Sequence, residues 1–241
     1  MASITRHAPI NLDEFTLKDV LISENELGYG SSGNVLKLEY QGLKCAGKKI
    51  YQFLGIVFEK GTQLLILVTE FLPTDLRSCL EHYGVLHDEI SYSILHDVSL
   101  GLAFLHSQTP QIIHLDISST GILLSANMTA KICDFGSAMI FEGKYQQMTF
   151  APGSPPYMPP ETLVDDPHYD ASVDVFSFGA LMVEMFTAKL PLPEIARARK
   201  DPAGILIVIS EVERRQNLLN KIGDKHPLMD LITSCLSNNP D

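Results

Sequence analysis

Two aspartates, Asp116 and Asp134, are the residues of this chain whose type and setting best suit chemistry. Asp116 precedes a short apolar strand expected at 122–124, and Asp134 follows another expected at 130–133. The two strands direct both carboxylates at one point, and carboxylates can accept a proton or hold a metal cation. Either aspartate alone could equally be an ordinary turn residue.

A glycine-rich turn runs from Leu27 to Val35, between two expected strands. Gly28, Gly30 and Gly33 give it the spacing G-x-G-x-x-G. A dinucleotide-binding fingerprint requires a helix after the last glycine, whereas a strand is expected here. Bare glycine backbone in such a hairpin can lie over phosphate groups, although three glycines can also form only a flexible turn.

Two later segments have a similar ambiguity. Ala46 and Lys48 fall on one face of an expected strand, because strand side chains alternate. A further apolar strand is expected at 64–71; it contains Thr69 and Glu70 and is followed by Leu72. Taken alone, the first segment could be a strand with a solvated lysine, and the second an apolar edge strand.

These segments resemble, in the same order, motifs of the protein kinase family. The turn is similar to the kinase glycine-rich loop, the strand with Lys48 to the lysine strand, and residues 67–73 to the hinge. Residues 114–116, His-Leu-Asp, resemble the catalytic loop, and residues 134–136, Asp-Phe-Gly, resemble the metal-binding segment.

Two further segments strengthen the resemblance. Residues 159–161, Pro-Pro-Glu, are similar to the Ala-Pro-Glu motif that ends the kinase activation segment. Residues 172–179 are similar to the helix whose aspartate, here Asp174, braces the catalytic loop. Six partial matches in order are far more specific than any one of them, so the chain is identified as a protein-kinase-like domain.

The resemblance implies a site for ATP and one Mg²⁺ ion between two lobes. Asp116 would be the catalytic base, Lys48 would act on the phosphates, and Asp134 would hold the metal. Gly-Ser-Pro at 153–155 is more like serine/threonine kinases than tyrosine kinases, so the implied acceptor is a protein Ser or Thr. The other implied nucleotide-binding residues are Leu27, Gly28, Gly30, Gly33, Val35, Ala46, Thr69, Glu70, Leu72 and Leu123.

The catalytic loop departs from the family at three positions. Leu115 stands where active members have an Arg, Ser118 where they have a Lys, and Gly121 where an Asn would hold a second Mg²⁺. Charge neutralisation is the main catalytic contribution in phosphoryl transfer, so these losses are expected to reduce rate rather than to alter the fold.

Two family elements are also expected to be missing. Only residues 49–52 separate Lys48 from the next strand, whereas an ordinary helix needs roughly 11 residues, so the helix that would supply a Glu partner to this lysine does not fit. The sequence also stops at Asp241, where family members continue into an Arg that would pair with Glu161.

Composition sets wider bounds. The chain has 241 residues, 45% of them hydrophobic, and a formal net charge of -11, which argues against general nucleic-acid binding. Its four cysteines include no C-x-x-C pair, which argues against a zinc site or a disulfide framework and favours the cytoplasm. The apolar runs are too short to span a membrane.

Strands are expected first and helices afterwards, which predicts an α+β, two-lobed fold. We expect a poorly structured leader at 1–16, an N-lobe at 17–72 with an antiparallel sheet but without its usual helix, and a mainly helical C-lobe at 73–241, truncated at its end. Helices are expected at 171–187, almost wholly apolar, and at 228–236. A third has an apolar face comprising Ile90, Ile94, Val98, Leu102 and Leu105.

Two functions follow from these features. The first is an ATP-binding protein-kinase-like domain with impaired phosphotransfer to protein Ser or Thr. The alternative is an inactive pseudokinase that acts as a signalling scaffold or binding module. Either would have a protein substrate or docking partner, and the N-lobe groove left uncovered by the missing helix is the expected docking place.

Overall fold

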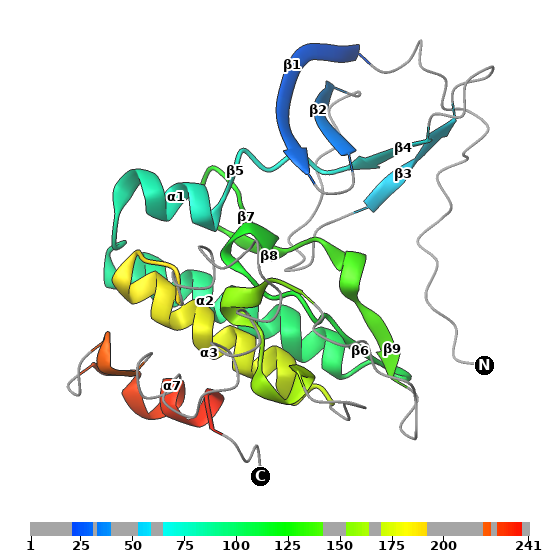
Figure 1. Ribbon diagram of the computed structural model, residues 1–241. Coiled ribbons are helices and arrows are strands. Elements are labelled where there is room, and N and C mark those ends of the chain that lie inside the picture. The colour runs from blue at the N-terminus through cyan, green and yellow to red at the C-terminus, as the bar shows by residue number, and fades with distance from the viewer. Residues whose placement is uncertain are drawn as a thin grey trace. The chain divides into compact units, whose positions relative to one another are not determined.

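The computed structural model describes residues 21–30, 33–39, 53–58, 65–141, 153–163, 170–191, 219–222 and 226–237. The chain divides into two units, Met1–Leu72 and Pro73–Asp241, whose elements are labelled in Figure 1. Several expectations lie outside the described residues: the leader, the strand with Ala46 and Lys48, the missing helix after it, and the end of the chain.

The glycine-rich turn of the first unit joins two paired strands. β1 (Leu21–Gly30) runs antiparallel to β2 (Gly33–Glu39), with Gly30 opposite Gly33. The sequence-based prediction of a hairpin, rather than a strand followed by a helix, is confirmed.

A second pair of strands follows in the same unit. β3 (Phe53–Phe58) runs antiparallel to β4 (Leu65–Thr69). Both are rich in aromatic, β-branched and other apolar residues, which pack well on a pleated surface. The expected antiparallel character of this unit is confirmed for its described strands.

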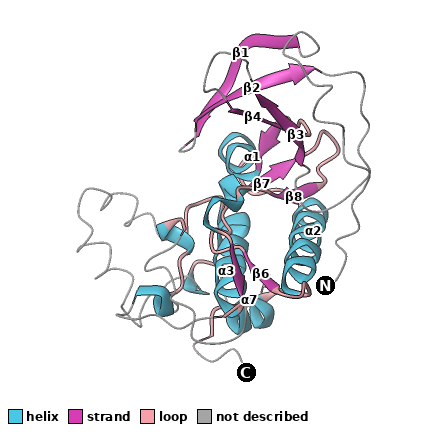
Figure 2. Ribbon diagram, turned by 90° about the vertical axis from the view of Figure 1, so that its right-hand side faces the viewer, coloured by secondary structure: helices cyan, strands magenta, loops and turns pink. Residues whose placement is uncertain are grey.

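The second unit is built around four described helices, α1 (Leu76–Tyr83), α2 (Asp88–His106), α3 (Ser172–Thr187) and α7 (Met229–Cys235). Figures 1 and 2 show α2 beside α3, and α7 against α3. A Cβ at Gly179 of α3 would lie 2.9 Å from the nearest side-chain atom of α7, so this glycine permits their close packing. α3 is buried along most of its length, as its apolar sequence predicts.

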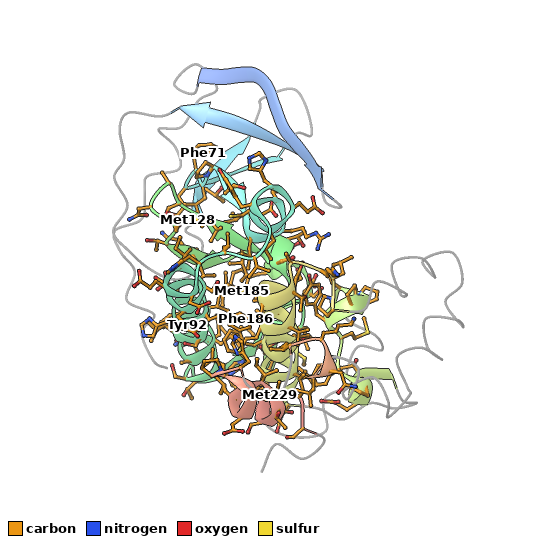
Figure 3. All side chains as sticks on the ribbon, turned by 90° about the vertical axis from the view of Figure 1, so that its left-hand side faces the viewer. Phe71, Tyr92, Met128, Met185, Phe186 and Met229 are labelled. Atoms are coloured by element: carbon orange, nitrogen blue, oxygen red, sulfur yellow. The ribbon has the colours of Figure 1, made fainter. Side chains whose placement is uncertain are left out.

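The apolar face of α2 supplies much of the core. Four of its five expected positions are buried: Ile94, Val98, Leu102 and Leu105. The expectation for Ile90 is wrong, since this residue is 37% exposed and lies in the first turn, at the edge of the packed face. Figure 3 shows Tyr92 and Phe186 between α2 and α3, and their ring centroids are 6.3 Å apart.

Short strands in the second unit position the two aspartates. β5 (Thr74–Asp75), β7 (Ile122–Leu124) and β8 (Ala130–Ile132) form one sheet in that order. β6 (Gln111–Ile113) pairs with β9 (Met139–Phe141). β7 and β8 are the two apolar strands expected from the sequence.

Four 3₁₀ turns connect these elements: η3 (Ser119–Gly121), η4 (Phe135–Ser137), η5 (Pro155–Tyr157) and η6 (Pro160–Leu163). They lie at the loops where the family motifs occur. No helix in the described part of the chain has both the length and the apolar content that a membrane span requires.

Candidate active site

Asp174, in the first turn of α3, fixes the backbone of the expected catalytic loop. Its Oδ2 accepts the His114 N–H at 2.8 Å, and its Oδ1 accepts the Leu115 N–H at 2.8 Å. The side chain of His106 approaches the same carboxylate, with Nε2 2.8 Å from Oδ2. Asp174 is 0% exposed, and hydrogen bonds to a charged, buried acceptor are among the stronger ones.

His114 connects this loop to the Asp-Phe-Gly segment. Its Nε2 lies 3.0 Å from the Cys133 carbonyl oxygen, while its Nδ1 accepts the Asp116 N–H at 3.3 Å. This arrangement requires a neutral ring with its proton on Nε2. Burial lowers the pKa of His114, which favours that neutral form. The ring also packs edge-on against Phe135, with centroids 4.8 Å apart.

The carboxylate of Asp116 contacts the segment at 153–154. Its Oδ1 accepts the Ser154 N–H at 2.8 Å. Gly153 has φ +85°, and a Cβ there would come within 2.2 Å of the Leu115 carbonyl oxygen. Only a glycine therefore lets this backbone lie directly on the catalytic loop.

Asp134 follows β8 and caps η4 in a left-handed conformation, φ 62°. It is exposed, and its Oδ1 accepts the Gly136 N–H at 3.4 Å. Asp116, Asp134 and Asp174 all lie near enough to His114 to favour a positive charge on its ring. The two aspartates singled out from the sequence therefore both influence the charge of the same buried histidine.

The donor chemistry of this region suits magnesium. Among the described residues, no three His, Cys, Asp or Glu side chains gather into a complete metal site. Mg²⁺ does not require one, because it keeps several waters and is commonly held by one or two carboxylates together with phosphate oxygens. The exposed carboxylate of Asp134 fits that mode of binding.

Ser118 and Gly121 show how the loop packs without its usual polar side chains. Ser118 is 3% exposed, and its Oγ accepts the Gly121 N–H at 3.3 Å and lies 3.0 Å from Thr120 Oγ1. This hydroxyl caps η3. A Cβ at Gly121 would meet its nearest neighbour, the Asp116 carbonyl oxygen, at 3.4 Å, which is an ordinary contact.

The residues expected to hold the nucleotide are spread over several elements. Leu123 is the half-buried middle residue of β7, opposite Lys131 of β8. Ala46 and Lys48 lie outside the described residues. The others belong to the first unit: Leu27, Gly28 and Gly30 in β1, Gly33 and Val35 in β2, and Thr69 at the end of β4 with Glu70 and Leu72 after it.

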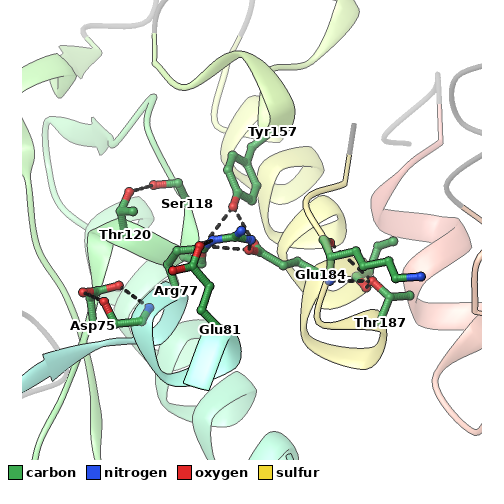
Figure 4. Close-up of polar contacts among 12 residues, drawn as sticks. Asp75, Arg77, Glu81, Ser118, Thr120, Tyr157, Glu184 and Thr187 are labelled. Atoms are coloured by element: carbon green, nitrogen blue, oxygen red, sulfur yellow. Dashed lines mark hydrogen bonds and ion pairs between the residues drawn. The ribbon is translucent and has the colours of Figure 1, made fainter. Parts of the chain in front are cut away.

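A polar cluster, buried except for the partly exposed Arg77, lies beside the catalytic loop and was missed by the sequence reasoning. It consists of Arg77, Ser119, Tyr157 and Glu184, and Figure 4 shows Arg77, Tyr157 and Glu184 pointing toward one another. The available signal was Glu184 itself, a carboxylate within a helix that is otherwise almost wholly apolar. Nothing in its local sequence indicates the partners.

Comparison with known proteins agrees with this arrangement. Residues 39–241 match the family described as protein kinase domain. The chain therefore belongs to the protein kinase family, which confirms the resemblance seen in the sequence and the α+β fold that it implied.

Curated relatives are similar over most of this chain. Serine/threonine-protein kinase WNK3 of Mus musculus is 31% identical over 186 residues, 75% of this chain. Serine/threonine-protein kinase CTR1 of Arabidopsis thaliana is 28% identical over 195 residues, or 79%, and probable serine/threonine-protein kinase kinX of Dictyostelium discoideum is 29% identical over 250 residues, or 90%. The matches span only 10%, 22% and 22% of those relatives' own lengths.

Proposed function

We propose that this chain binds ATP with one Mg²⁺ ion and transfers the terminal phosphoryl group, slowly, to Ser or Thr hydroxyls of a protein. The observation that carries the proposal is the hydrogen bond from Ser154 N–H to Asp116 at 2.8 Å, on a loop fixed by Asp174. A carboxylate so oriented would accept the proton of the acceptor hydroxyl as its oxygen attacks phosphorus and the bond to the leaving ADP breaks. Asp134 would hold the metal ion, which neutralises charge on the phosphates.

The nucleotide would be bound by the residues at the family's nucleotide-binding positions. Lys48 would contact phosphate oxygens, and the glycine hairpin would cover them with bare backbone. Thr69 would lie behind the base. Val35, Ala46 and Leu123 would enclose the base, and the backbone of Glu70–Leu72 would bind its edge, with Leu27 at the start of the hairpin.

Slow transfer follows from the polar side chains that the catalytic loop lacks. Leu115 stands where active members have the Arg that pairs with a phosphorylated activation segment, so that pairing is lost. Ser118 cannot contact the transferring group as the family's Lys does, and Gly121 cannot hold a second ion as the family's Asn does. Removing a single electrostatic contact of this kind commonly lowers the rate about 10²- to 10³-fold. We therefore expect turnover far below the roughly 1–100 per second typical of kinases.

A second candidate, the inactive pseudokinase, is favoured by the packing at Ser118. This hydroxyl is committed to the η3 cap, so the loop is stable without a cation at that position. In that case the chain would signal by docking a protein, with the uncovered groove of the N-lobe (17–72) as the docking place. A cytoplasmic location suits either candidate, given the cysteine spacing.

A thermal-shift titration with ATP, with and without Mg²⁺, tests the nucleotide binding that the first candidate requires. Ligand at a hundred times its dissociation constant should stabilise the fold by about 2.7 kcal/mol. Lys48→Met should abolish the shift. Labelled ATP and a generic protein acceptor then separate the candidates: slow transfer that disappears in Asp116→Asn supports the kinase. Absence of any shift at millimolar ATP, or an equal shift in Lys48→Met, would overturn ATP binding.

A further inference from the structure

Glu184 is a fully buried carboxylate that joins three segments far apart in the sequence. Arg77 of α1 donates to its Oε1 from Nη1 at 2.7 Å, and Ser119 of η3 donates to the same oxygen at 3.0 Å. The hydroxyl of Tyr157, in η5, donates to Oε2. A buried charge is costly unless it is paired and hydrogen-bonded, so this carboxylate favours one arrangement of α1, η3 and η5 around α3.

Tyr157 is fixed at both ends by this arrangement. Its hydroxyl contacts Glu184 and lies 2.9 Å from Ser119 Oγ, while its carbonyl oxygen accepts the Ser177 hydroxyl at 3.0 Å. Burial and the neighbouring Glu184 raise the pKa of Tyr157, so its hydroxyl keeps the proton that it donates. The residue is 5% exposed.

The η5 turn connects Tyr157 to Asp116 through Ser154, which lies three residues before Tyr157 in the chain. Tyr157 N–H donates to the Ser154 carbonyl oxygen at 3.0 Å, and Ser154 N–H donates to Asp116 Oδ1 at 2.8 Å. Among the described residues, the Ser154 N–H is the group that donates a hydrogen bond to the Asp116 carboxylate. The orientation of that carboxylate therefore depends on where η5 is held.

We propose that Tyr157 and Glu184 are positioning residues for Asp116, acting through the η5 turn and the Ser154 N–H. This inference deepens the proposed phosphotransfer function and rests on it. With Asp116 Oδ1 bound to Ser154, its second oxygen is left to accept the acceptor proton. Loss of the Tyr157 hydroxyl frees one end of η5, so the Asp116 carboxylate rotates among several orientations.

The first experiment measures hydrogen exchange of the Ser154 amide by NMR in the full chain, which requires no phosphotransfer. Tyr157→Phe keeps the ring and removes the hydroxyl, and the Ser154 amide should exchange about tenfold faster, the change expected from one hydrogen bond. The matched control is Thr187→Ala in α3, whose hydroxyl donates to Val183 O at 2.7 Å, outside the cluster. Equal Ser154 exchange rates in the two variants would overturn the proposal.

The second experiment compares Glu184→Gln with Glu184→Ala. Gln keeps an oxygen that can accept from Tyr157, although its N–H₂ group cannot accept from Arg77 or Ser119, whereas Ala keeps no acceptor at all. Ser154 exchange and kcat should therefore change less in Glu184→Gln than in Glu184→Ala, with the KM for ATP unchanged in both variants. Equal losses in both, or a change confined to KM, would overturn the positioning role. If the wild-type chain transfers no phosphate, the proposed function fails, and Ser154 exchange still decides whether this cluster positions Asp116.

Discussion

Asp174 holds Leu115 in a backbone conformation that leucine seldom adopts. The Leu115 N–H lies 2.8 Å from Asp174 Oδ1, and the leucine has φ 64°. A left-handed conformation costs an ordinary residue roughly 1–2 kcal/mol, so it persists only where surrounding bonds favour it. The hydrogen bonds to Asp174 supply this preference and turn the chain sharply just before Asp116.

Asp174→Asn should lower the free energy of unfolding by about 2–5 kcal/mol. The amide replaces one carboxylate oxygen with an N–H₂ group, which would face the buried backbone donors of His114 or Leu115 without accepting from them. Urea denaturation measures the loss. The matched control is Asp170→Asn, since Asp170 is exposed, accepts the Ser172 N–H at 2.8 Å, and can be replaced by Asn in that role. A loss no larger than that of the control would contradict this account of the brace.

Gly153→Ala should be far more damaging than Gly84→Ala. Both glycines have positive φ, +85° and +74°, but a Cβ at Gly84 meets nothing within 4 Å, whereas one at Gly153 meets the Leu115 carbonyl oxygen at 2.2 Å. Gly84→Ala should therefore cost about 1–2 kcal/mol, the backbone penalty alone. Gly153→Ala adds a backbone clash and separates Ser154 from Asp116, so both stability and phosphotransfer should fall. Similar unfolding midpoints for the two variants would rule out the close approach at Gly153.

Acid should destabilise the second unit partly through His114. Burial lowers its pKa, whereas nearby Asp174, Asp116 and Asp134 oppose that shift. The unfolded chain, with an ordinary histidine pKa near 6.5, therefore binds the proton more readily than the folded chain does. The stabilising contribution is complete above about pH 6.5 and is lost as the pH falls toward the lower folded pKa.

The variant His114→Gln provides the measurement. Urea denaturation at pH 7.5, 6.5 and 5.5 should show a shallower pH dependence than in the wild type, by at most about 1.4 kcal/mol per pH unit, the value for one proton. Gln can still donate to Cys133 O but does not titrate in this range. An identical pH dependence in both proteins would exclude His114 as the group responsible.

Gly121→Asn should raise any phosphotransfer activity, whereas Ser118→Lys alone should not. A Cβ at position 121 would make only ordinary contacts, and the amide oxygen of the introduced Asn would add a metal ligand. Ser118→Lys, in contrast, removes the hydroxyl that accepts the Gly121 N–H. An increase of about 10²-fold is the scale of one recovered electrostatic contact. Initial rates with labelled ATP provide the check, with Gly121→Ala as the control for packing. Equal rates in the Asn and Ala variants would show that the missing ligand does not limit the reaction.

Much of the fold could be predicted because its signals are local. The spacing of Ile94, Val98, Leu102 and Leu105 defines one face of α2, and the apolar residues of α3 indicate its central place. Asp116, Asp134 and Asp174 were found through short motifs whose spacing the chain has kept. The position of Ile90 was predicted wrongly because helical periodicity does not show where a packed face ends.

The cluster around Glu184 could not be predicted because its partners are distant in sequence. Arg77 and Glu184 are separated by 107 positions, and Ser119 and Glu184 by 65, so no local pattern joins them. The use of Ser118 as a cap was equally hidden, since a serine that replaces a lysine looks only like a lost charge. Lys48 and Ala46 lie outside the described residues, and their roles stay predictions.

Gly121 and Ser118 differ in how the surrounding structure would receive a different side chain. At 121 a Cβ would lie in ordinary van der Waals contact with its neighbours, the nearest being the Asp116 carbonyl oxygen at 3.4 Å, so the backbone there accepts a side chain. At 118 the serine side chain is part of the turn that precedes β7, so replacing it would remove a stabilising bond. A substitution at 121 therefore leaves the turn intact, whereas a substitution at 118 removes one of the side chains that form it.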